Sequence, residues 1–210
     1  MKEEPIFIDG LLGVGYMHEL RRRFGVNSNC WAWLEDTCFD GTRDKIVAPE
    51  GMIIKDAGCL SNAIYNRSQE RVIESEYDFL MHSTYAIEAA MRKQIMRLDR
   101  MKVNLYLPQT MDGAKEDVIF TPHQDSEILL DNGYTALINY SEAEHVAPTY
   151  LYNVDSRDGK YHMSVAHKMY LKPGDCVIFP SYWFHSSSHC NKYRQNINII
   201  FNTGDRSWAN

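Results

Sequence analysis

The sequence predicts a mainly β fold with flanking helices, in which short strands form a sandwich or jelly-roll core. Apolar residues at helical spacing dominate two segments before residue 101, and strand-like segments about 8–12 residues apart follow it. The chain has 210 residues, a formal charge of −6 and 44% hydrophobic residues, an ordinary balance for a globular protein. We therefore expect a single domain over 1–210, with a helix-rich part at 1–100 and a β core at 101–205.

Two segments of the N-terminal part have helical patterns. In residues 11–24 the apolar side chains include Leu12, Met17 and Leu20, and arginines lie near the end. Residues 75–101 are expected to form one longer helix or two in succession, because apolar side chains recur there at three- and four-residue steps. These apolar positions indicate packing in a core rather than a cofactor site.

After residue 101 the pattern changes to short strands bounded by turns. The last strand is the clearest, since Ile197, Ile199 and Phe201 alternate with asparagines, which indicates burial on one face only. Turns are expected at 110–116, which contains Asp-Gly, and at 172–175, which reads Lys-Pro-Gly-Asp. The expected strands are 103–107, 118–120, 134–140, 148–154, 161–170, 176–179 and 195–202.

Composition also limits the compartment and the partners. No stretch of about 18 apolar residues could span a membrane, and the N-terminus lacks the pattern of a secretory signal, so we expect a cytoplasmic protein. Arg92, Lys93, Arg97, Arg100 and Lys102 have the spacing of a solvated helix face. A nucleic-acid surface needs clustered cations and is therefore disfavoured. Nothing in the sequence indicates an oligomeric state.

The cysteines indicate thiols rather than disulfides. Five occur, at Cys30, Cys38, Cys59, Cys176 and Cys190. Their number is odd, no two form a C-x-x-C pair, and no secretory signal accompanies them, so we expect buried free thiols.

The strongest chemical signal is the tripeptide His123-Gln124-Asp125. In an extended strand, residues i and i+2 point to the same face, so His123 and Asp125 can converge on one metal ion. Two histidines and one carboxylate are the ligands of non-haem Fe(II) oxygenases, because this set leaves positions open for a co-substrate and O₂. The tripeptide alone has little specificity, and His123 could equally be a hydrogen-bonded structural histidine.

His185 and Arg194 supply the context that the tripeptide lacks. His185 follows a turn, a hydrophobic strand and an aromatic run, and Arg194 lies nine residues further on. The order His123-x-Asp125, His185, Arg194 resembles the 2-oxoglutarate/Fe(II) dioxygenase superfamily, in its prolyl-hydroxylase-like branch. The resemblance covers residues 103–202. It implies a double-stranded β-helix, a distorted jelly roll, with His123, Asp125 and His185 as the iron ligands.

Three further segments strengthen the resemblance. Asn104-x-Tyr106 looks like a pair that contacts 2-oxoglutarate in many members, and residues 172–179 look like the family's Pro-x-x-Gly run before the distal histidine. The segment 147–152 lies where prolyl-hydroxylase-like relatives carry Gly-Gly-x-Thr-x-Tyr, but it begins with Ala-Pro. Asn196 also stands where many members have Ser or Thr, and the first 100 residues match no pattern of the family. These departures leave the subfamily open.

The resemblance implies a reaction that uses Fe(II), 2-oxoglutarate and O₂. Arg194 would hold the distal carboxylate of 2-oxoglutarate, because a guanidinium offers a planar, bidentate and permanent charge. Tyr106 would donate its hydroxyl, with Asn104 or Asn196 as helpers. The expected products are succinate, CO₂ and a hydroxylated substrate, first a prolyl, peptidyl or free amino-acid group and otherwise another small molecule. Since Asp125 is a carboxylate rather than Ala or Gly, halogenation is disfavoured.

Two other classes of protein stay open on the sequence. A cupin-like metal-binding jelly roll would need neither 2-oxoglutarate nor Arg194, and a binding module that has only kept the fold would hold no metal. Residues 27–69 form a long irregular segment that we expect to supply part of a pocket or a lid.

The remaining histidines are expected to have no ligand role. His189 lies too close to Arg194 for the spacing of the family, and His145, His162 and His167 are expected in loops or on strand surfaces. Tyr182 and Trp183, which precede His185, could contact substrate or pack between strands.

Overall fold

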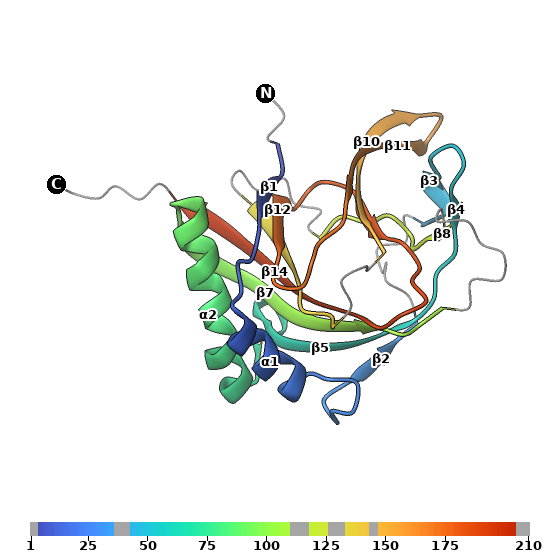
Figure 1. The fold of residues 1–210 in the computed structure, drawn as a ribbon. Coiled ribbons are helices and arrows are strands. Elements are labelled where there is room, and N and C mark those ends of the chain that lie inside the picture. Colours follow the sequence, from blue (N-terminus) through green and yellow to red (C-terminus); the bar gives the residue numbers. More distant parts are fainter. Residues whose placement is uncertain (1–3, 36–42, 110–117, 126–132, 143–146, 205–210) are drawn as a thin grey trace.

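A computed structural model of the chain describes residues 4–35, 43–109, 118–125, 133–142 and 147–204. Two β-sheets face each other, and two α-helices cover the outer face of the larger sheet (Figure 1). The prediction of a mainly β fold with flanking helices is confirmed. The turn expected at 110–116 lies outside the described residues. Within those residues, no helix has the length and apolar character needed to cross a membrane.

The described residues contain two α-helices, two 3₁₀ turns and fourteen strands. The helices are α1 (Val14–Arg23) and α2 (Glu74–Met91), and the 3₁₀ turns are Arg43–Lys45 and Arg67–Gln69. The strands are β1 (Ile6–Ile8), β2 (Ala32–Leu34), β3 (Ile46–Val47), β4 (Ile53–Ile54), β5 (Cys59–Asn66), β6 (Arg71–Val72), β7 (Gln94–Tyr106), β8 (Val118–Ile119), β9 (Gly133–Asn139), β10 (Thr149–Arg157), β11 (Lys160–Met169), β12 (Cys176–Pro180), β13 (His185–Ser187) and β14 (Arg194–Gly204).

The larger sheet has the strand order β1-β12-β9-β14-β7-β5-β2, with β6 paired to β5. The smaller sheet has the order β13-β10-β11-β3, and β4 pairs with β8 separately. Leu137 and Phe179 of the larger sheet pack against Leu151 of the smaller one, so apolar contacts hold part of the space between the sheets. Most strands expected after residue 101 are present; β13 and the strands before residue 94 were not expected.

The central strands β7 and β14 have two chemically different faces. Their antiparallel register places Val103 opposite Ile197 and Asn104 opposite Asn196. The apolar face, which carries Val103 and Ile197, packs in one core with Leu20 of α1 and other helical side chains. The opposite face carries polar and charged side chains and points toward the smaller sheet. Alternation along two paired strands therefore separates the core from a polar interior.

The helix expected over 75–101 is correct only as far as Met91. Arg92 ends α2 with a left-handed φ of 54°, and residues 94–106 form β7. The helix prediction for 94–101 is wrong because apolar residues such as Ile95 and Leu98 pack against the core from the strand instead. Hydrogen bonds to β14, which lies far away in sequence, favour the extended conformation.

Two further expectations are corrected. The described parts of the segment 27–69, which are 27–35 and 43–69, are not irregular throughout, because β5 forms an interior strand of the larger sheet between β7 and β2. β14 is buried on both faces rather than one. Its asparagines, such as Asn196 and Asn198, face the polar interior between the sheets and not the solvent. An alternation of apolar and polar residues predicts two different faces, but it does not say that water covers the polar one.

The turn expected at 172–175 is confirmed and depends on glycine. Gly174 has a φ of 93°, and a Cβ there would lie 2.9 Å from the carbonyl oxygen of Leu12. The Asp175 carboxylate accepts hydrogen bonds from the backbone N–H groups of Gly10 and Lys172. The turn thereby ties the N-terminal segment to the start of β12.

The cysteines of the described residues are free thiols, as expected. Cys59, Cys176 and Cys190 are buried and Cys30 is partly buried, while Cys38 lies outside the described residues.

Candidate active site

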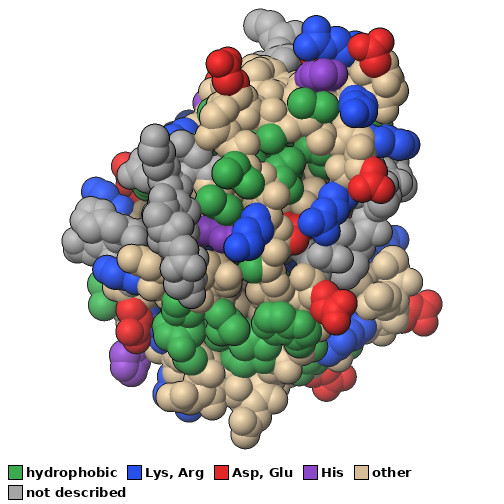
Figure 2. Space-filling model, turned by 90° about the vertical axis from the view of Figure 1, so that its right-hand side faces the viewer, with side chains coloured by type: hydrophobic (Ala, Val, Ile, Leu, Met, Phe, Trp, Pro, Cys, Tyr) green, Lys and Arg blue, Asp and Glu red, His purple; other side chains and the backbone are tan. Residues whose placement is uncertain are grey.

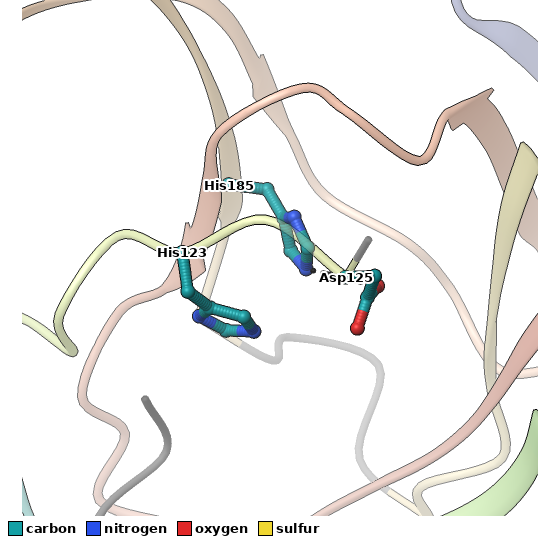
Figure 3. Close-up of side chains that lie close together, drawn as sticks. All are labelled: His123, Asp125 and His185. Carbon is teal, nitrogen blue, oxygen red and sulfur yellow. Dashed lines mark ion pairs between the residues drawn. The ribbon is translucent and has the colours of Figure 1, made fainter. Parts of the chain in front are cut away.

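His123, Asp125 and His185 form a cluster in the interior between the sheets (Figure 3). Their possible ligand atoms all lie within 4.8 Å of one another, and Nε2 of His185 is 3.4 Å from Oδ2 of Asp125. His123 and His185 stand opposite each other in an antiparallel bridge, with reciprocal backbone hydrogen bonds of 3.0 and 2.9 Å. Two separate segments thus bring three ligand-type side chains to one point.

Both imidazoles have the tautomer and the charge that metal binding requires. Nδ1 of His123 lies 3.2 Å from the carbonyl oxygen of Thr121, and Nδ1 of His185 lies 3.2 Å from that of Trp183. A carbonyl only accepts, so Nδ1–H donates and Nε2 keeps its lone pair. Burial, followed by the neighbouring His185, lowers the pKa of His123 to about 3, and burial also lowers the pKa of His185. Both rings are therefore neutral at pH 7.

Asp125 is fixed by side chains from three strands of the larger sheet. Its Oδ1 accepts a hydrogen bond of 2.5 Å from Arg100 on β7. Its Oδ2 accepts from Thr135 on β9 at 3.0 Å and from Asn198 on β14 at 3.1 Å. Burial raises the pKa of Asp125, but the electrostatic interactions with His185 and with the Arg100 guanidinium outweigh burial and hold that pKa well below its usual range. The carboxylate is ionised and oriented.

A carboxylate from the N-terminal part supports His123. Asp56 is buried and accepts hydrogen bonds from the backbone N–H of Thr121 at 2.8 Å and from its hydroxyl at 2.5 Å. Thr121 is the residue whose carbonyl accepts from His123. The adjacent carbonyl of Lys55 contacts Nε2 of His189 at 2.6 Å. Residues 55 and 56 therefore hold the segments that carry both histidines of the cluster.

Arg194 lies deeper on the same polar face, opposite Tyr106. It is buried, and it donates to the hydroxyl of Thr149 at 2.5 Å and to the carbonyl of Pro148 at 3.5 Å. The guanidinium carbon is 5.9 Å from the centre of the Tyr106 ring. Burial raises the pKa of Tyr106, which keeps its hydroxyl protonated. The segment 147–152, compared above with a family pattern, contains Thr149 but gave no sign that Thr149 orients Arg194.

The two predicted helper residues pair with each other. Asn104 donates through Nδ2 to Oδ1 of Asn196 at 2.9 Å, and its own Oδ1 accepts from the Ser61 hydroxyl at 2.9 Å. The side chain of Asn196 shares a hydrogen bond with Tyr106. Together these groups form a buried polar network beside Arg194. Their contact with a co-substrate stays a prediction.

Arg100 and Lys102 do not lie on a solvated helix face, contrary to expectation. Both belong to β7 and alternate with the buried Met101 and Val103. Arg100 and Asn104 contact partners in the polar interior, so Lys102, which lies between them in the strand, faces the same way. Burial, followed by the charge of Arg100, lowers the pKa of Lys102 to about 8. Figure 2 shows one face of the molecule on which basic side chains border a hollow that contains a histidine.

The other candidate residues are not members of the cluster. His189 contacts Lys55 and is not a member of the cluster, and His162 and His167 are partly exposed on β11. His145 lies outside the described residues. Trp183 packs in an apolar cluster with the partly buried Tyr182 beside it, which favours the packing role that the sequence had left open.

No protein-family model and no curated protein matches the sequence. Solved structures match over nearly the whole chain. A prolyl-4-hydroxylase from Pseudomonas putida is 14% identical, with 94% of this chain and 91% of that chain covered and a TM-score of 0.52. A prolyl hydroxylase from Trichoplax adhaerens, solved with a hypoxia inducible factor peptide fragment, is 10% identical, with 94% and 83% covered and a TM-score of 0.56. The epimerase SnoN, solved with Fe³⁺, alpha ketoglutarate and nogalamycin RO, is 13% identical, with 96% and 79% covered and a TM-score of 0.54.

These similarities define the class of fold. The chain has the jelly-roll core of the 2-oxoglutarate/Fe(II) oxygenases, and the prediction of a double-stranded β-helix is confirmed. The similar structures include hydroxylases and an epimerase, so the fold alone does not select one reaction. The chemistry has to be argued from the side chains.

Proposed function

We propose that this chain is a 2-oxoglutarate- and Fe(II)-dependent dioxygenase that hydroxylates a C–H bond of a prolyl, peptidyl or free amino-acid substrate. One observation carries the proposal. A His-Asp-His cluster, carried by the segment after β8 and by β13, contacts the polar face of β7 and β14, and the same face carries a buried arginine paired with a tyrosine. These are the two binding sites that a chelating keto acid with a distal carboxylate requires.

The donor set fits Fe(II). Two neutral imidazole nitrogens, from His123 and His185, and one ionised oxygen, from Asp125, match the facial set of non-haem Fe(II) oxygenases. The hydrogen bonds that both Nδ1–H groups donate and those that Asp125 accepts fix the direction in which each ligand points. The cluster would therefore hold the ion without rearrangement of its supports.

The pair Arg194 and Tyr106 fits the distal carboxylate of 2-oxoglutarate. Arg194 uses part of its five N–H donors on Thr149 and Pro148, and these two contacts hold the plane of the guanidinium. Tyr106 offers a protonated hydroxyl on the neighbouring strand. A charged, planar donor held in this way binds a carboxylate through charge-assisted hydrogen bonds.

Iron and 2-oxoglutarate, when bound, supply the activation of O₂, with one oxygen atom entering a C–H bond and the other leaving in succinate as CO₂ is released. The residues of the chain bind and orient these groups, and the sheets on either side limit access of water to them. SnoN, of similar fold, was solved with iron and alpha ketoglutarate, which supports the assignment of both groups here. The prolyl hydroxylases among the similar structures support a prolyl or amino-acid substrate.

The proposal is tested by anaerobic titration of 2-oxoglutarate into Fe(II)-loaded protein while the weak visible charge-transfer band of a chelated keto acid is recorded. We expect the band in the wild type and its loss in Asp125→Ala. In Arg194→Ala the band should need at least about tenfold more 2-oxoglutarate, because a buried charge-assisted contact to the carboxylate is removed. Arg157→Ala is the control, since Arg157 is exposed on the β10–β11 hairpin.

The outcomes separate the alternatives. Iron binding without a band at millimolar 2-oxoglutarate would favour a cupin-like metal protein. Absence of iron binding would favour a binding module that has kept the fold. An unchanged midpoint in Arg194→Ala would remove the co-substrate role of that residue.

A further inference from the structure

Two cations beside the cluster neither coordinate iron nor bind 2-oxoglutarate in the assignment above. Arg100 and Lys102 lie on the polar face of β7 at the level of the cluster, because Arg100 contacts Asp125 and Lys102 pairs across the sheet with Asn198. Asn198 itself donates to Asp125. The two cations are thus next to Asp125, the side chain that would bind iron. Arg194 lies on β14 four residues before Asn198.

This part of the polar face has unused hydrogen-bonding groups. Arg100 donates through Nη2 to Asp125, but its Nε is buried and has no partner among the described residues. The Lys102 ammonium has no ion-pair partner within the described part of the chain. Buried donors without acceptors are uncommon in folded proteins and often mark the position of a ligand. The group that is missing here is a hydrogen-bond acceptor, and it would lie beside two positively charged side chains.

The charges of the site indicate the sign of the missing group. Among the described residues on the polar face beside the cluster, Arg100, Lys102 and Arg194 are positive and Asp125 is negative. Asp56, which lies behind Thr121, forms an ion pair with Arg43 at 3.4 Å. Fe(II) would bring two positive charges and the 2-oxoglutarate dianion two negative ones, so together they leave the excess of cations unchanged. Uncompensated charge in a partly buried site is unfavourable, and an anionic group of the substrate would offset it.

We propose that Arg100 and Lys102 form a carboxylate-binding subsite and that the substrate carries a carboxylate, as a free amino acid does. This inference rests on the proposed function, because 2-oxoglutarate is assigned to Arg194 and to the iron, which leaves the subsite to the substrate. A carboxylate held at β7 would place the neighbouring carbon atoms of the substrate beside the His-Asp-His cluster. The inference favours a substrate with a free carboxylate over a neutral peptide segment.

The subsite is tested with acetate as the probe and acetamide as its uncharged counterpart. The melting temperature of the anaerobic protein loaded with Fe(II) and saturating 2-oxoglutarate is measured against each compound at constant ionic strength. We expect saturable stabilisation by acetate and none by acetamide. Lys102→Met should weaken the acetate response at least about tenfold, whereas Lys102→Arg should retain it. Lys160→Met, on the exposed end of β11, is the matched control.

Two results would overturn the subsite. The first is an equal response of the wild type to acetate and acetamide. The second is an acetate response that persists unchanged in Lys102→Met, because acetate would then bind the iron rather than the cations. Lys102→Gln, which is polar and similar in length, replaces the methionine variant if the latter does not fold, and the same two criteria apply.

The charge-transfer band recorded on the same samples separates this inference from the proposed function. If the wild type gives no band, the proposed function fails whatever acetate does. If the band forms but acetate does not bind, the proposed function stands and the subsite is wrong. A tenfold higher 2-oxoglutarate midpoint in Lys102→Met, without any acetate response in the wild type, would assign Lys102 to the co-substrate and also overturn the inference.

Discussion

Asp125 shows how much of the site is built around a single side chain. Its two oxygens accept hydrogen bonds from Arg100, Thr135 and Asn198, which belong to three adjacent strands. A carboxylate held at both oxygens has little rotational freedom, so its direction is set before any ion binds. Replacing Asp125 would therefore remove a proposed metal ligand and also leave the partly buried Arg100 without its counter-charge.

Asp56 is expected to influence iron binding although it does not touch the ion. In Asp56→Asn only one acceptor oxygen remains, so the two hydrogen bonds that Thr121 donates cannot both persist, and the Thr121 carbonyl that orients His123 shifts. Changes in the groups that orient metal-binding side chains lower metal affinity by about 10–100-fold. Competition with a chelator for Fe(II) measures the effect, and Asp155→Asn is the control because Asp155 is exposed. An unchanged affinity would limit Asp56 to a structural role.

Lys102 should make the stability of the metal-free protein depend on pH. The ordinary pKa of a lysine is 10.5, and burial with Arg100 nearby lowers that of Lys102 to about 8. Between these values the unfolded chain keeps a proton that the folded protein has released, so stability rises with pH. We expect the free energy of unfolding of the wild type, relative to Lys102→Met, to increase by about 1–3 kcal/mol from pH 8 to pH 10.

Chemical denaturation of both proteins at several pH values measures this difference. Tyrosines and other titrating groups are common to the two proteins and cancel in the comparison. A flat difference between pH 8 and pH 10 would mean that the Lys102 ammonium is as well solvated in the folded protein as in the unfolded chain.

At the scale of elements, α2 joins the larger sheet mainly through apolar contacts. Leu80 is fully buried in the core that also contains side chains of β7 and β14. Leu80→Ala should lower the free energy of unfolding by about 2–4 kcal/mol, because it leaves a cavity in a packed interface. Tyr85→Ala on the same helix, where the side chain is exposed, should have a much smaller effect. Denaturation curves of the two variants test this, and equal losses would contradict the assigned packing.

The same elements show which parts of the fold the sequence can predict. Strands after residue 101 were predictable because turns bound them and alternation is regular, as in Ile197, Ile199 and Phe201. The first half of β7 was not, because Ile95, Leu98 and Met101 suit one side of a helix as well as a strand. The decision between them comes from pairing with β14, a contact that no local pattern records.

The candidate site divides in a similar way. His123, Asp125, His185 and Arg194 could be named from the sequence, because each lies in a short motif with a defined order. Two of their supports, Asp56 and Thr135, lie in segments that have no fixed spacing to those motifs. Thr149 lies in the segment 147–152, whose pattern did not indicate a contact with Arg194. Arg100 and Lys102 were missed for a second reason: a wrong helix assignment turned their side chains toward solvent.

In the whole molecule, an apolar layer and a polar layer lie on opposite faces of one sheet. The helices cover the apolar face, and the smaller sheet stands over the polar face that carries the site (Figure 1). Substitutions in the helix layer should therefore change stability more than the arrangement of the site, since the strands lie between them. Substitutions on the polar face should change the arrangement of the site more than the stability, except where they leave a charge unpaired.

The reciprocal backbone bridge between His123 and His185 also affects the choice of metal. This bridge fixes the spacing of the two histidines before a metal ion binds. The site therefore does not discriminate between ions by rearranging around one of them. Divalent ions of similar radius then compete through their intrinsic affinity, and Zn²⁺, Ni²⁺ and Cu²⁺ all bind nitrogen and oxygen ligands more tightly than Fe(II) does. Occupancy by iron would thus depend on which metals the surroundings supply.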